Sequence, residues 1–100
     1  MSNAINTSEL TEKIVSKVRE LLHSNKKYSD ILNADPVILK SEKEDGTTTI
    51  DKISFYGFGF IAVYPNRIVF MPDMVDSDAK KVLAKYDSWD ELLNMQPVAV

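Results

Sequence analysis

The sequence predicts one α+β domain with an N-terminal helix, a four-stranded antiparallel β-meander and one or two C-terminal helices. Three observations lead to this prediction. Apolar residues recur at helical spacing before residue 25, β-prone runs follow between residues 37 and 71, and helical spacing with capping residues returns after Pro72. The 100 residues contain no internal repeat and no low-complexity segment, so we expect a single domain over residues 1–100.

The N-terminal part of the chain has the pattern of an amphipathic helix over residues 8–24. Leu10, Ile14 and Val18 repeat at intervals of four residues and define an apolar stripe, while charged residues fill the other sides. Residues 1–6 are expected to be disordered or partly derived from an expression tag, because Ser2-Asn3-Ala4 resembles a tag-cleavage remnant. A short helical turn is expected over residues 28–33, before Pro36.

The middle of the chain predicts a meander of strands. Asp45-Gly46 and Pro65-Asn66 are typical of tight turns between strands. Ile50 and Ile53 are three residues apart, so regular alternation along a strand would place their side chains on opposite faces. A β-bulge or turn is therefore expected near Asp51-Lys52. The predicted strands cover residues 37–40, 47–56, 58–64 and 67–71.

The last part of the chain predicts helices. Val82, Leu83 and Tyr86 share one face of a helix expected over residues 76–86, with Asp76 or Ser77 as its N-cap. Ser88-Trp89-Asp90-Glu91 matches the capping box, in which the serine bonds forward and the glutamate reaches back. A second short helix should therefore begin after Ser88.

Composition argues against several classes of function. The chain has 12 basic and 15 acidic residues, and its formal net charge of −3 arises entirely after Pro72. Because nucleic-acid binding usually requires an excess of basic residues, we expect none. No apolar stretch approaches the roughly 20 residues that a membrane helix needs, and no signal peptide is visible, so we expect no membrane partner and a cytoplasmic location. With no cysteine and one histidine, we expect no metal site and no cofactor.

Two segments resemble known binding motifs in their residues but lack features that those motifs require. Residues 57–62 read Gly-Phe-Gly-Phe-Ile-Ala, but a dinucleotide site needs a helix after the glycines, and this segment is β-prone. Asp73, Asp76 and Asp78 are acidic, but their spacing and the lack of a glycine among them do not fit a calcium loop. We interpret the glycines as a strand corner or bulge, and the aspartates as helix caps or an acidic docking surface.

The central hairpin is apolar on both faces, which is unusual for an antiparallel sheet with one solvated face. Either the chain's own helices cover both faces, or one face is an interface, and the scarcity of helices favours an interface. The candidate partner-binding residues combine one face of the hairpin with the acidic stretch; they are Tyr56, Phe58, Phe60, Tyr64, Asp73, Asp76 and Asp78.

The functional hypothesis is a non-catalytic protein-interaction module that binds a protein partner or forms a homodimer. Toxin-neutralising immunity proteins, secretion chaperones and phage accessory proteins have similar size and charge, which is an analogy and not homology. The alternative is a small-ligand-binding or enzymatic subunit with a pocket between sheet and helices. An ionisable residue held inside the apolar sheet would support it, and Lys52 and Arg67 are the basic residues near that sheet.

Overall fold

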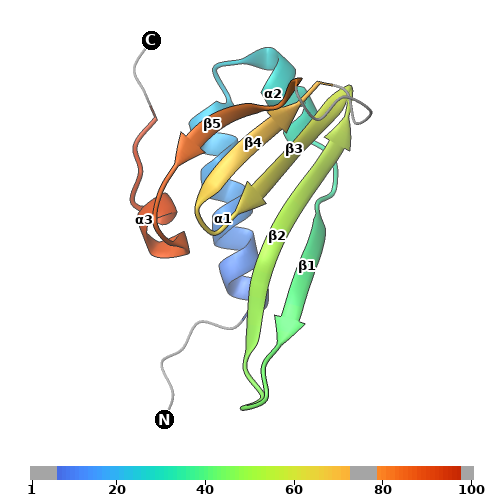
Figure 1. Cartoon of the computed structure of the whole chain (residues 1–100). Coiled ribbons are helices and arrows are strands. Elements are labelled where there is room, and N and C mark those ends of the chain that lie inside the picture. The colour runs from blue at the N-terminus through green and yellow to red at the C-terminus, as the bar shows by residue number, and fades with distance from the viewer. Residues whose placement is uncertain (1–6, 73–78, 98–100) are drawn as a thin grey trace.

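The computed structural model describes residues 7–72 and 79–97, which form an α+β fold (Figure 1). Two helices come first, followed by an antiparallel sheet of five strands in the order β1-β2-β3-β4-β5 and by one short helix. The elements are α1 (Thr7–Leu22), α2 (Lys26–Leu32), β1 (Val37–Glu42), β2 (Thr48–Gly57), β3 (Gly59–Tyr64), β4 (Arg67–Met71), β5 (Lys81–Lys85) and α3 (Trp89–Leu93).

The fifth strand corrects the prediction of four strands and of a helix over residues 76–86. Residues 81–85 pair with β4 as β5, and residues 73–78 lie outside the described part of the chain. The spacing of Val82, Leu83 and Tyr86 fits a helix and also fits a short strand with a bulge. The strand form satisfies the backbone groups along the free side of β4, because Val69 pairs with Val82 and Ile68 pairs with Ala84. Leu83 is the extra residue between these two pairs.

The predicted bulge lies at the expected place. Leu39 pairs with Lys52 and Lys40 pairs with Ile50, which leaves Asp51 as the extra residue of β2. Because of this extra residue, Ile50 and Ile53 are both buried although their sequence parity differs. Asp45-Gly46 closes the β1–β2 hairpin, with Gly46 at φ +85°, and Asp45 accepts hydrogen bonds from the backbone and side chain of Thr47. These hydrogen bonds hold the pKa of the Asp45 carboxyl below its usual value.

Helices α1 and α2 cover one face of the sheet; in Figure 1 they lie behind it. α1 contributes Ile14 and Val18, which are fully buried, and α2 contributes Ile31 and Leu32. The Arg19 guanidinium donates to the carbonyl of Leu32 at 2.8 Å and so ties the end of α2 to α1. The hydrophobic core therefore lies between these helices and a single face of the sheet.

The short α3 is held by its cap and by the residue that ends β5. The Ser88 hydroxyl accepts a hydrogen bond from the Glu91 N–H at 3.2 Å, which confirms the serine half of the predicted capping box. The Glu91 carboxylate reaches back as predicted, but it accepts from the N–H of Asp87, one residue before the cap. The buried Tyr86 directs its hydroxyl to the carbonyls of Tyr64, at 2.5 Å, and Arg67, at 3.0 Å. Burial raises the pKa of the Tyr86 phenol well above its usual value. Tyr86 thus fixes the end of β5 to the β3–β4 turn.

Candidate functional site

The strand register divides the sheet into a face that packs on the helices and an opposite face, here called the outer face. Ile53, Phe55 and Ile61 belong to the face that packs on the helices, and all three are fully buried. The neighbours of these residues point the other way, because side chains alternate along a strand and paired residues share a face. The outer face comprises Val37, Leu39, Lys52, Ser54, Tyr56, Phe60, Ala62, Tyr64, Arg67, Val69, Met71, Val82 and Lys85.

The large exposed apolar side chains gather on the outer face. Val37, Leu39, Tyr56 and Val82 are exposed by 56%, 52%, 43% and 42%, and all four belong to this face. α1, α2 and α3 do not cover it: the first two pack on the opposite side, and α3 packs near α1 beside β5 (Figure 1). The described helices therefore leave this face uncovered, and its solvent-exposed apolar area lies at Val37, Leu39, Tyr56 and Val82.

The centre of the outer face is buried, since Ser54, Ala62 and Val69 are at most 5% exposed. Phe60 is 7% exposed, and its ring centre lies 4.9 Å from that of Tyr56. The Lys52 ammonium lies 6.0 Å from the centre of the Phe60 ring. Long side chains lying over an aromatic ring keep it out of water, yet they can move aside at little cost. The centre is thus a recessed aromatic patch beneath adaptable side chains.

Cations predominate on the outer face of an acidic protein. The Arg67 guanidinium carbon lies 4.2 Å from the centre of the Tyr64 ring, which is a cation–π distance. Lys85 pairs with Arg67 in the sheet and is exposed, and Lys52 is the third basic residue. Asp51, the bulge residue beside Lys52, accepts a hydrogen bond from the Ser41 hydroxyl. Three basic residues therefore accompany the apolar patch, although the chain's net charge is −3.

The structure brings together three of the four aromatic residues that the sequence grouped. Tyr56, Phe60 and Tyr64 lie on the outer face. Phe58 lies at the tip of the β2–β3 hairpin, between two glycines, and is 97% exposed. Parity does not continue through a turn, so Phe58 is beside the outer face and not part of its centre. The other predicted residues, Asp73, Asp76 and Asp78, lie outside the described residues.

Several residues of this face are not among the candidates predicted from the sequence. Val37, Ile38 and Leu39 form a continuous apolar run. Because side chains alternate along a strand, the strand predicted over residues 37–40 places Val37 and Leu39 on the face opposite Ile38, and this reasoning could have identified them. Val82 was placed in a helix, so its position opposite Val69 was not foreseen. Lys52 and Arg67 were noted only as basic residues near the sheet; Arg67 lies over an aromatic ring.

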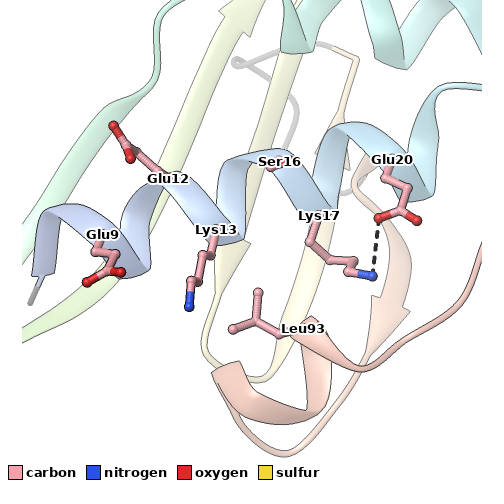
Figure 2. Close-up of a pocket in the computed structure, with 7 residues that line it drawn as sticks. All are labelled: Glu9, Glu12, Lys13, Ser16, Lys17, Glu20 and Leu93. Atoms are coloured by element: carbon pink, nitrogen blue, oxygen red, sulfur yellow. Dashed lines mark ion pairs between the residues drawn. The ribbon is translucent and has the colours of Figure 1, made fainter. Parts of the chain in front are cut away.

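A depression on the other side of the molecule is a solvated helix surface. Figure 2 shows Glu9, Glu12, Lys13, Ser16, Lys17 and Glu20 along α1, with Leu93 of α3 facing them. The Lys17 ammonium lies 3.2 Å from a carboxylate oxygen of Glu20 and donates to the Met95 carbonyl at 3.0 Å. The bond to Met95 attaches the segment after α3 to α1, so we assign this depression a structural role.

Depressions at the contact between sheet and helices bear on the alternative hypothesis of a ligand pocket. One of them, between the start of α1 and β2, has the ionisable residues Lys43 and Asp51 in its lining, and Asp51 accepts a hydrogen bond from the Ser41 hydroxyl. A small depression lies between the end of α1 and the β4–β5 pair; it is lined by Leu21, Leu22, Ser24, Ile68, Leu83, Ala84, Met95 and Gln96. No ionisable side chain lines it. Within residues 7–72 and 79–97, no three histidine or carboxylate side chains gather as a metal site would need, and every buried side-chain polar atom has a hydrogen-bond partner.

Comparison with protein-family models, with curated proteins and with solved structures finds no match to this chain. None of the described helices has the length and apolar character needed to cross a membrane. The outer face itself is therefore the feature from which a function can be proposed.

Proposed function

We propose that this chain is a non-catalytic protein-interaction module that binds a protein partner through the outer face. One observation carries the proposal: four of its large apolar side chains are more than two-fifths exposed on one sheet face that no described helix covers. Large apolar side chains exposed on one surface are typical of interaction sites in soluble proteins. The analogy with small immunity proteins, secretion chaperones and phage accessory proteins agrees with this function but does not choose among them.

The chemistry of the outer face suggests the chemistry of its partner. Tyr56, Phe60 and Tyr64 supply the aromatic area that dominates binding energy in many interfaces. Lys52, Arg67 and Lys85 would meet carboxylates, since complementary charge accelerates association and excludes wrong partners. The partner we propose therefore presents apolar side chains bordered by acidic residues.

Site-specific photocrosslinking in the native cell tests this function. A benzophenone amino acid replaces Tyr56 in one variant, Val82 in a second and the exposed Ser16 of α1 in a control. We expect the first two variants to give the same covalent adduct with another protein and the Ser16 variant to give none. An adduct from Ser16 alone, or equal adducts from all three positions, would contradict the proposal.

A charge reversal combined with the Tyr56 probe tests the acidic character of the partner. Arg67→Glu should reduce the yield of the Tyr56 adduct by about tenfold, because a close charge pair at an interface becomes a repulsion. Lys13→Glu on α1 is the matched control and should leave the yield unchanged. An unchanged yield with Arg67→Glu would rule out an acidic partner surface at this position.

A further inference from the structure

The two edges of the sheet differ in how they are protected against pairing with another strand. β5 carries the bulge at Leu83 and has a lysine at each end, Lys81 and Lys85. Bulges and lysines are common devices that prevent edge-to-edge association. β1 is less protected. It has no bulge, because the extra residue of the β1–β2 pair lies in β2, and it contains a single lysine, Lys40.

The free side of β1 presents backbone groups at alternate residues. The Lys43 N–H donates to the Thr47 carbonyl at 2.7 Å, so the backbone of Lys43 faces β2. Backbone direction alternates along a strand, and β1 has no inserted residue to break the alternation. The N–H and C=O groups of Ile38, Lys40 and Glu42 therefore point away from the sheet, and no described strand pairs with them.

These positions restrict how two copies of β1 can pair antiparallel across a two-fold axis. Residues with outward backbone groups must oppose one another, which allows registers centred on Ile38, Leu39, Lys40 or Ser41. Those centred on Leu39 and Lys40 pair five residues of β1 with the second copy, whereas the other two pair three. Centring on Lys40 places two lysines face to face, which is unfavourable. Centring on Leu39 places Ile38 opposite Lys40 of the second copy, and Leu39 opposite Leu39 of the second copy.

The register centred on Leu39 also matches charges. It places Asp35 opposite Lys43 of the second copy, and by symmetry Lys43 opposite Asp35, giving two oppositely charged pairs at the flanks. Both residues are exposed in the single chain. Centring on Ile38 shifts the second copy by two residues and removes both pairs. Centring on Ser41 places Lys40 opposite Glu42 but leaves Val37, Ile38 and Leu39 without partners in β1. Strand overlap and charge together therefore select the register centred on Leu39.

From this edge we propose that β1 binds β1 of a second copy of this chain, in the register centred on Leu39, and joins two sheets into one of ten strands. The pairing buries Leu39, now 52% exposed, against its counterpart. It also brings the two outer faces side by side, because the axis stands perpendicular to the sheet. The inference goes beyond the proposed function and does not rest on it. Two strands make a small interface, so the dimer should be weak and depend on concentration.

A single introduced cysteine tests the register, since the chain has no cysteine of its own. In the proposed register the two Leu39 residues form a pair without backbone hydrogen bonds, with Cα atoms about 4.5 Å apart. Disulfides form at Cα separations of about 4.4–6.8 Å. Leu39→Cys should therefore crosslink two full chains under copper–phenanthroline and oxygen, which accept the electrons of the two thiols.

Val37→Cys is the matched control on the same strand and face, with similar exposure, 56% against 52% for Leu39. In the proposed register the two Val37 residues lie four positions apart along the strands, about 13 Å. We expect crosslinking of Leu39→Cys at least about tenfold faster than that of Val37→Cys, a difference set by these separations. Equal rates for the two variants, or a faster rate for Val37→Cys, would overturn the proposal.

A charge swap provides a second, reversible measurement by sedimentation equilibrium. The unmodified chain should approach twice 11.3 kDa at high concentration. Asp35→Lys alone and Lys43→Asp alone should each weaken dimerisation by about tenfold, since each places like charges in both flanking pairs. The double variant Asp35→Lys/Lys43→Asp should restore it. A monomer at every concentration, or a double variant no better than the single ones, would overturn the proposal whatever the outcome of partner crosslinking at Tyr56.

Discussion

Phe55→Ala should lower the free energy of unfolding by about 3–5 kcal/mol, the usual cost of removing a buried phenylalanine ring. Phe55 has no exposed surface, and it pairs with Ile61 on the face that packs against the helices. Removing the ring leaves a cavity that neighbouring residues fill only in part. Small domains have only about 5–15 kcal/mol of stability in total, so this variant should be close to unfolding. Urea denaturation of the full chain measures the change.

The adjacent Tyr56→Ala is the control, because Tyr56 points to the opposite, outer face. It should cost about 1 kcal/mol, mainly the loss of its contact with the Phe60 ring. Two consecutive residues should thus differ severalfold in their effect on stability. Equal losses for both variants would contradict the assignment of a sealed face and an open face.

Gly59→Ala should lower the free energy of unfolding by about 2–4 kcal/mol through backbone strain and crowding together. Gly59 has φ +112°, a backbone conformation that residues with a side chain rarely adopt. A Cβ there would meet Cε1 of Phe70 at 2.9 Å and the Met71 carbonyl oxygen at 3.2 Å. The Phe70 ring cannot move freely, since its centre lies 5.0 Å from that of Tyr28 on α2. Thermal unfolding followed by circular dichroism measures the effect.

The other glycine of this hairpin provides the comparison. A Cβ at Gly57 would lie 3.4 Å from Cγ1 of Ile31, an ordinary contact, and the residue has no positive φ. Gly57→Ala should therefore change stability by less than about 1 kcal/mol. If Gly57→Ala proved as damaging as Gly59→Ala, the hairpin geometry described here would be wrong.

Features governed by local sequence could be predicted. The stripe of Ile14 and Val18 indicated α1, and Ser88 with Glu91 indicated the start of α3, because neighbours along one helix decide both. The bulge at Asp51 followed from the parity of Ile50 and Ile53 alone. In each case the residues that determine the structure lie within a few positions of one another.

Features governed by distant pairing could not be predicted. Val82 and Leu83 fit two periodicities, and the free backbone groups of β4 favour the strand. The choice of which hairpin face the helices cover depends on packing between residues far apart in the chain, so the sequence identified two apolar faces without assigning them. Tyr56, Phe60 and Tyr64 were grouped correctly by alternation, whereas Phe58 was not, because the chain turns at that residue.

Carbene footprinting of the full chain at low concentration tests most directly the central claim that the outer face is open. Tyr56 and Val82 should be clearly labelled, though less than the hairpin tip residue Phe58, whereas Phe55 and Ile61 should stay unlabelled. This result would leave the outer face free for a partner. Protection of Tyr56 and Val82 to the level of Phe55 in the isolated chain would contradict the claim and the function proposed from it.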